Sequence, residues 1–159
     1  MSENQNRLET SLSSAVATTL ENMTFEEIEV VDEPASAEIS DDMIWAAVPI
    51  LQPHEGELVV RVAPEYAKIL AEEVFGSADE AISDAAVKDV IAEMANTIAG
   101  RFMNELVPSD EEFRLGLPNT GVGKFQEGSD QVTSILINVG EHPLVTSVIG
   151  NDFVKLTNE

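Results

Sequence analysis

The sequence predicts an α+β fold, with helices packed on one face of a mainly antiparallel sheet. Three observations lead to this prediction. Apolar residues recur at helical spacing in three segments. Several other segments are rich in β-branched residues, and short turns join them, as is typical of antiparallel strands. The elements come in the order helix, hairpin, two helices and β meander, which favours helices grouped on one side of an antiparallel sheet.

The first predicted helix runs from Arg7 to Met23, and we expect residues 1–6 to form a disordered tail. Its apolar face comprises Leu8, Leu12, Val16 (or Ala15), Thr19 and Met23. The following segment, Glu26 to Ala37, mixes acidic residues with Val and Pro. This mixture predicts a short edge strand or an exposed connection.

A hairpin and a second helix come next. The segments Met43–Leu51 and Glu57–Val62 are rich in strand-forming residues and flank a five-residue loop, Gln52–Gly56. Pro64 is suited to open the helix and Gly76 to end it. The predicted apolar side of this helix comprises Tyr66, Ile69, Leu70 and Val74.

The longest predicted helix runs from Asp84 to Leu106, with Ser83 as its N-cap and Pro108 just beyond its end. At about 100° per residue, one apolar stripe lies within roughly 60° of Val87. The stripe comprises Val87, Val90, Ile91, Met94, Ile98 and Phe102. The opposite face comprises Asp89, Glu93, Asn96 and Gly100. A carboxylate and a carboxamide therefore lie side by side on the face that points away from the core.

The remainder of the chain predicts a meander of strands. The predicted strands are Glu112–Leu117, Gln131–Val139, Leu144–Ile149 and a short one around Val154–Leu156. Pro118–Gly123 is expected to be a loop, and Gly140–Pro143 is expected to be the turn of a hairpin.

Length and composition indicate one domain over residues 1–159, because 43% hydrophobic content at this length suffices for a core. The absence of cysteine excludes disulfides and thiol chemistry. With no apolar run long enough to span a membrane and no signal sequence, we expect a cytoplasmic protein. The net charge of -22 argues against nucleic acid or a membrane as partner. Much of the excess lies in Glu26–Asp42, which serves either solubility or steering toward a basic partner.

Familiar catalytic and metal-binding patterns are missing from the sequence. The two histidines, His54 and His142, each lie beside a proline in a predicted turn and outside any metal-ligand spacing. The segment around Gly123-Lys124-Phe125 lacks the first glycine and the Ser or Thr of a phosphate-binding loop. We therefore expect no metal site and no bound cofactor. The polar face of the long helix is the remaining candidate site.

The spacing of Glu93 and Asn96 is weak evidence by itself. Polar residues opposite an apolar stripe are the default in an amphipathic helix, and Glu3 and Asn6 repeat the same spacing. The whole stretch from Asp89 to Gly100, however, resembles the signature helix of the CheC, CheX and FliY phosphatases of bacterial chemotaxis.

In that family an acidic residue or serine is followed by a glutamate four positions on, an asparagine three after it, and a proline about two dozen positions later. Asp89, Glu93, Asn96 and Pro118 follow this order, with a gap before Pro118 that is about one residue shorter than usual. Three more segments resemble CheX, namely Leu20–Phe25, Gly116–Pro118 and Ser134–Asn138. The presence of one signature helix favours CheX over CheC, whose members typically carry two.

The resemblance implies a CheC-like fold and a phosphatase that hydrolyses the aspartyl phosphate of a CheY-type response regulator. It implies that Asn96 positions the attacking water and that Glu93 docks on the receiver's lysine, with Mg²⁺ supplied by the receiver. It also implies a homodimer. Asp89, Gly100 and Pro118 are candidate supporting residues, of which Gly100 is suited to the close approach of another backbone.

Two alternatives remain open. The same helix face suits a non-catalytic module that binds receivers or flagellar motor components without turnover. The chain could also be a dimerisation module, in which the strand Gln131–Val139 pairs edge to edge with its copy.

Overall fold

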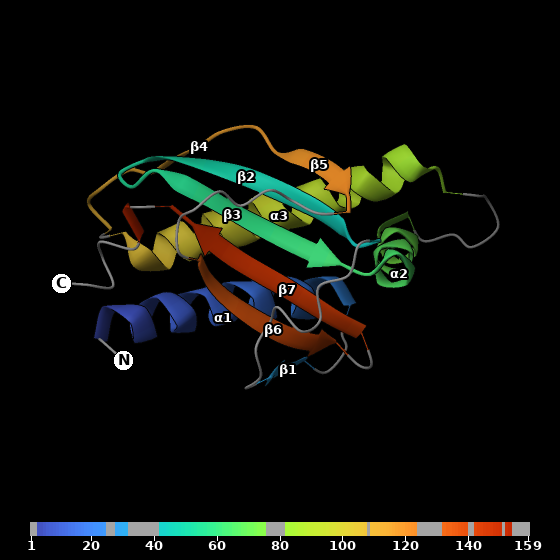
Figure 1. Ribbon diagram of the computed structural model, residues 1–159, viewed down its shortest axis with the longest axis horizontal. Coiled ribbons are helices and arrows are strands. Elements are labelled where there is room, and N and C mark those ends of the chain that lie inside the picture. The colour runs from blue at the N-terminus through green and yellow to red at the C-terminus, as the bar shows by residue number, and fades with distance from the viewer. Residues whose placement is uncertain are drawn as a thin grey trace.

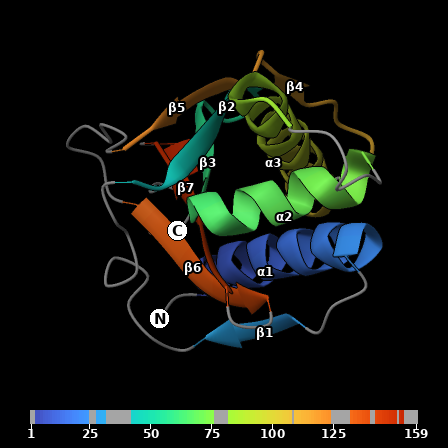
Figure 2. The same ribbon diagram turned by 90° about the vertical axis from the view of Figure 1, so that its right-hand side faces the viewer.

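The computed structural model describes residues 3–24, 28–31, 42–75, 82–107, 109–123, 132–139, 142–150 and 152–153. In these ranges three helices lie against one face of a sheet of seven strands, and the paired strands are antiparallel (Figures 1 and 2). The predicted α+β class, with helices on one face of an antiparallel sheet, is confirmed.

The helices are α1 (Glu3–Thr24), α2 (Pro64–Phe75) and α3 (Asp84–Leu106). The strands are β1 (Ile28–Val31), β2 (Ile44–Gln52), β3 (Gly56–Val62), β4 (Arg114–Leu115), β5 (Asn119–Val122), β6 (Val132–Val139) and β7 (His142–Ile149). None of the helices in the described ranges is long and apolar enough to cross a membrane.

The strand order is β1-β6-β7-β3-β2-β4, and β5 also pairs with β2. The predicted hairpin is confirmed as β2 and β3, in register from Ile44 opposite Val62 to Ile50 opposite Gly56. At the other end of the sheet, β1 is an edge strand paired with β6, which decides between the two alternatives for residues 28–31. Strand β7 pairs with β6 along its whole length, whereas β1 covers the other edge only over Leu136–Val139. This half of β6 is therefore closed to edge-to-edge pairing with a second copy, and pairing of the remainder stays a prediction.

The core lies between the helices and the sheet. All six residues of the predicted apolar stripe of α3 are buried, and Ile91, Ile98 and Phe102 have no exposed surface. Helix α1 runs antiparallel to α3 (Figure 1). An Arg7 Nη donates a 2.7 Å hydrogen bond to the Leu106 carbonyl, and Ser14 Oγ donates one to the Glu105 carboxylate at 3.0 Å. Helix α2 lies across the end where α1 finishes and α3 begins (Figure 1).

Helix α1 begins earlier than predicted. It starts at Glu3, so the expected disordered tail is helical from residue 3 on. The apolar pattern that marks the helix from the sequence begins only at Leu8. Arg7 is anchored to the end of α3, and extending an established helix by another turn needs no new nucleation. Polar residues therefore continue the helix without an apolar signal.

The segment that follows α3 also differs from the prediction. Residues 119–122, expected to be a loop, form strand β5, and the strand predicted over Glu112–Leu117 is reduced to β4. Strand β2 determines both outcomes, since it pairs with β4 and with β5 on the edge that β3 leaves free. Gly121 lies against the Trp45 ring, where a Cβ atom would come within 2.4 Å of Cζ2. Glycine, which indicates a loop in the sequence, here gives room for strand pairing.

The final hairpin has a shorter turn than predicted, because His142 and Pro143 already belong to β7. Four predicted features lie outside the described residues. These are the helix stop at Gly76, the break at Pro108, the turn residues 140–141 and the closing strand 154–156.

Candidate functional site

Helix α3 provides a fixed support for its exposed face. At its N-terminus, Ser83 Oγ accepts a 3.1 Å hydrogen bond from the backbone N–H of Ala86, as expected of an N-cap. At its C-terminus the Val107 N–H donates to the Met103 carbonyl at 2.9 Å. Both ends are capped and one side is buried, so the direction of the other side is set by the core.

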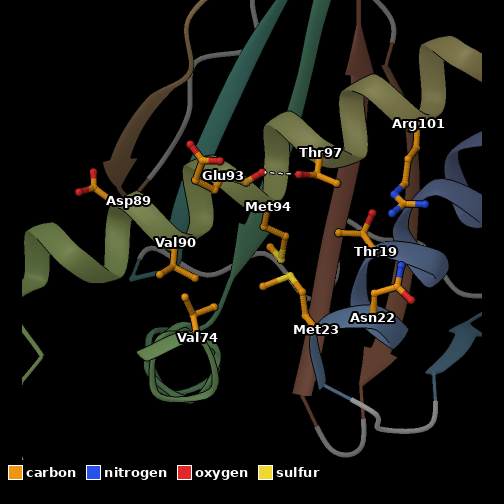
Figure 3. Close-up of a pocket in the computed structure, with 10 residues that line it drawn as sticks. All are labelled: Thr19, Asn22, Met23, Val74, Asp89, Val90, Glu93, Met94, Thr97 and Arg101. Carbon is orange, nitrogen blue, oxygen red and sulfur yellow. Dashed lines mark hydrogen bonds between the residues drawn. The ribbon is translucent and has the colours of Figure 1, made fainter. Parts of the chain in front are cut away.

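The exposed face carries the residues that the sequence places there. Asp89, Glu93 and Asn96 are all exposed. Thr97 Oγ1 donates a 3.0 Å hydrogen bond to the backbone carbonyl of Glu93. The Glu93 carboxylate itself points away from the helix (Figure 3). Among the described residues, none forms a hydrogen bond with the Asn96 side chain. The carboxylate and the amide are therefore presented to whatever approaches the helix.

The other two candidate residues have different surroundings. A Cβ atom built on Gly100 would meet no atom within 4 Å, so no neighbouring segment in the described part of the chain approaches it closely. Pro118 lies in the connection between β4 and β5, near the point where the Gly116 N–H donates to the Pro49 carbonyl at 2.8 Å. The structure thus brings Asp89, Glu93, Asn96 and Gly100 to one helix face and puts Pro118 on a separate segment.

A groove of about 320 Å³ runs beside Glu93, between the three helices (Figure 3). It is lined by Thr19, Asn22 and Met23 of α1, Val74 of α2, and Asp89, Val90, Glu93, Met94, Thr97 and Arg101 of α3. The prediction that Val74 belongs to the core side of α2 is wrong, because 54% of its surface is exposed. Val74 lies in the last turn of α2, where it lines the groove and is not covered by the other helices.

Sequence reasoning did not find the groove, because three elements far apart in the chain build it. The available signal was the position of two methionines, Met23 and Met94, each on the apolar stripe of its helix. Their side chains point toward one another in the groove (Figure 3). Methionine often lines adaptable binding surfaces, although core packing is the more common role.

Charge is unevenly distributed along the groove. Asp89 and Glu93 lie toward the N-terminal end of α3, and Arg101 lies toward its C-terminal end. The Arg101 Nε is buried and has no hydrogen-bond partner among the described residues. In Figure 3 the Arg101 side chain extends from α3 toward Thr19 and Asn22.

The two histidines pack against aromatic rings. His142 stacks on Tyr66 with 5.0 Å between ring centroids, and His54 meets Phe153 edge-on at 5.7 Å. In the part of the chain that the structure describes, no group of three or more His, Cys, Asp or Glu side chains is arranged to hold a metal ion. Within that part of the chain, the polar face of α3 therefore remains the candidate site.

Comparison with known proteins gives a family and a fold. The family model of the chemotaxis phosphatase CheX matches residues 44–138, which is more than half of the chain. Chemotaxis protein CheX from Vibrio vulnificus is similar in structure, with a TM-score of 0.72 at 13% identity over 89% of this chain and 95% of that one.

A chain in the CheX–CheY–BeF₃–Mg²⁺ complex from Borrelia burgdorferi has a TM-score of 0.68 at 17% identity, covering 88% of this chain and 95% of that one. The FliM middle domain from Vibrio alginolyticus has a TM-score of 0.65 at 13% identity, covering 96% of both chains. A comparison with curated proteins gave no match. At such low identities the structural likeness establishes a shared fold.

Proposed function

Because the chain belongs to the chemotaxis phosphatase CheX family, we propose that it accelerates hydrolysis of the aspartyl phosphate on a CheY-type receiver domain. One observation carries the proposal: Glu93 and Asn96 are exposed together on a helix whose opposite side is locked in the core. Neither side chain is needed to hold the fold, so both are available to a partner.

Asn96 positions the attacking water in this mechanism. The oxygen of the water forms a bond to phosphorus while the bond from phosphorus to the aspartate oxygen breaks, releasing inorganic phosphate and the free carboxylate. Such a transfer depends on in-line placement and charge neutralisation more than on a strong base. The amide oxygen of Asn96 accepts a hydrogen bond from the water and its N–H₂ donates one, which together fix the direction of attack.

Glu93 docks the partner. It lies one helical turn before Asn96, about 4.5 Å along the helix axis. Its exposed carboxylate is free to pair with the active-site lysine of the receiver, and this charge-assisted contact fixes the register in which Asn96 enters. Glu93 is thus the binding residue and Asn96 the catalytic one.

The metal belongs to the partner. A receiver's own acidic cluster and the phosphoryl group supply the oxygen ligands that Mg²⁺ prefers. When bound there, the ion neutralises the charge that develops on the phosphoryl oxygens. The Borrelia burgdorferi neighbour, a CheX–CheY–BeF₃–Mg²⁺ complex, is consistent with this division of labour.

The experiment is a phosphate-release assay with a phosphorylated receiver in large excess. Asn96→Ala should fold normally and lose the stimulated hydrolysis, by on the order of 10²-fold, because the water is no longer held in line. Asn104→Ala is the matched control, since Asn104 is exposed on the same helix two turns further on. Full activity of Asn96→Ala would overturn the mechanism.

A second candidate function is receiver or motor binding without turnover. The likeness to the FliM middle domain favours it, because that protein shares the fold. The two functions differ in stoichiometry: an enzyme releases many phosphates per chain, whereas a binding module captures one receiver and stops. The same assay, at a trace amount of this protein, separates them.

We also propose that the chain forms a homodimer, as its family resemblance implies. At that end of the sheet the edge strand is β1, which offers one side for pairing with a second copy. Sedimentation at micromolar concentration should show a dimer. A monomer at that concentration would contradict the proposal.

A further inference from the structure

We propose that the groove between α1, α2 and α3 receives an apolar side chain from the surface of the docked receiver, while a carboxylate of the same receiver contacts Arg101. This inference rests on the proposed function, because Glu93 belongs both to the exposed face of α3 and to the lining of the groove. It assigns the groove a role in partner selection, separate from the chemistry at Asn96.

The shape of the groove suits a side chain. Its floor is apolar, since Val90 and Met94 are almost fully buried and Met23 lies against them. Its rim includes Val74, which is 54% exposed although it is apolar. The volume of about 320 Å³ is at the low end of the range of roughly 300–1,000 Å³ for ligand pockets. One or two inserted side chains fill such a space, and their burial covers the exposed valine.

The charged residues along the groove indicate which charged groups of the receiver lie beside the apolar side chain. Arg101 and Glu93 are eight residues apart, which is about 12 Å along the helix axis. A complementary surface therefore carries a base opposite Glu93, an apolar side chain in the middle and a carboxylate opposite Arg101. Arg101 is partly exposed and lines the groove, so its guanidinium can donate charge-assisted hydrogen bonds to a carboxylate of the partner.

Position on the molecule favours a receiver as the occupant over a small molecule. Glu93 lines the groove and, one helical turn before Asn96, also belongs to the exposed face, so a protein held by Glu93 covers both at once. A free small ligand in the groove would instead compete with the receiver for this area. The two occupants thus make opposite predictions about receiver binding.

The test measures the affinity of a CheY-type receiver from the same organism, activated with BeF₃⁻ and Mg²⁺, for the full chain and its variants. The groove variants are Val74→Glu and Arg101→Gln. The matched controls are Leu51→Glu and Arg114→Gln, which make the same kinds of change at exposed positions near the opposite end of the sheet (Figure 1). Thermal unfolding of each variant verifies that the fold is retained.

Each groove variant should weaken receiver binding by about tenfold or more, as loss of an interface anchor typically does. In the turnover assay the same variants should raise KM and leave kcat at saturation within about twofold of the unaltered chain. Both controls should bind normally.

Normal binding by both groove variants would overturn the inference, and so would tighter binding, which indicates that the groove holds a competing ligand. The proposed function fails by a different result, namely full turnover by Asn96→Ala or no complex between the receiver and the unaltered chain.

Discussion

The two faces of α3 differ in what they contribute to the molecule. The buried face, including Ile91, Ile98 and Phe102, fills the space between the sheet and the other helices without any exposed surface. On the exposed face, the side chains of Glu93 and Asn96 form no hydrogen bond within the described residues. One face holds the fold together, and the other is held in place by it.

This difference predicts that the effects of mutation separate cleanly. Substitutions on the buried face should lower stability, and they should reduce activity only by reducing the folded fraction. Changes on the exposed face should alter partner binding or turnover at nearly constant stability, because surface substitutions away from special features change stability by less than about 0.5 kcal/mol. Three substitutions on α3 test this separation, and a fourth on β3 extends the comparison to a carboxylate away from the helix.

The largest effect is expected for Phe102→Ala. Phe102 is fully buried and packs near Phe153, with 6.1 Å between ring centroids. Removing the ring should lower the free energy of unfolding by about 3–5 kcal/mol, since the surrounding core cannot fully close the cavity. Urea denaturation measures the change. A loss below about 1 kcal/mol would show that the buried face is less tightly packed than described.

Glu93→Ala should have the next largest effect, and on binding alone. Losing the docking carboxylate should weaken the complex with an activated receiver by about tenfold, with urea denaturation unchanged. Glu112→Ala removes an exposed carboxylate beyond the end of α3 and is the control. Calorimetric titration of the receiver gives both affinities, and equal affinities for the two variants would remove Glu93 from the interface.

Gly100→Ala is the exception on the exposed face: it should raise stability and weaken docking, because a glycine inside a helix is itself destabilising. An alanine Cβ at Gly100 meets nothing within 4 Å, so the change should add about 1 kcal/mol to stability, as is usual for replacing glycine inside a helix. We expect this stabilised chain to bind the receiver less tightly, because the methyl group occupies the space for an approaching backbone. Unchanged affinity would leave Gly100 without a role in docking.

The smallest effect concerns a carboxylate away from α3. Burial raises the pKa of Glu57 on β3 above its usual value of 4.5. Between pH 4.5 and the raised pKa, the folded state therefore holds a proton on Glu57 that the unfolded state has lost. The stability contributed by that proton is present below pH 4.5 and is lost as the pH rises through the raised pKa. Glu57→Gln should therefore melt modestly higher than the unaltered chain at pH 7 and nearly equal to it at pH 4. Equal differences at both pH values would contradict this.

The sequence predicts α3 well because each of its signals acts locally. The stripe around Val87, the Ser83 cap and the polar face all follow from helix periodicity, and the structure places them accordingly. Strand β5 was not predictable in this way. Its pairing depends on the free edge of β2 and on the space that Gly121 leaves for Trp45, both of which are set by contacts distant in sequence.

The candidate site likewise has one part that local sequence signals predict and one part that depends on contacts distant in sequence. The sequence predicts that Glu93 and Asn96 share one exposed helix face, and the structure places both there; their roles stay a prediction. The groove beside them was missed because Met23, Val74 and Met94 come from three helices that meet only in the folded chain. Local periodicity places Val74 with the core, whereas the other helices do not cover it in the last turn of α2.

The contact between Gly121 and Trp45 also provides an intrinsic fluorescence probe. Trp45 is the chain's single tryptophan, and its indole lies beneath the strand that continues from Pro118. Its fluorescence is therefore a built-in optical signal of how that strand sits on β2. Titrating in a receiver that lacks tryptophan would reveal any shift of the Pro118 segment through the emission spectrum, with no dye and no added label.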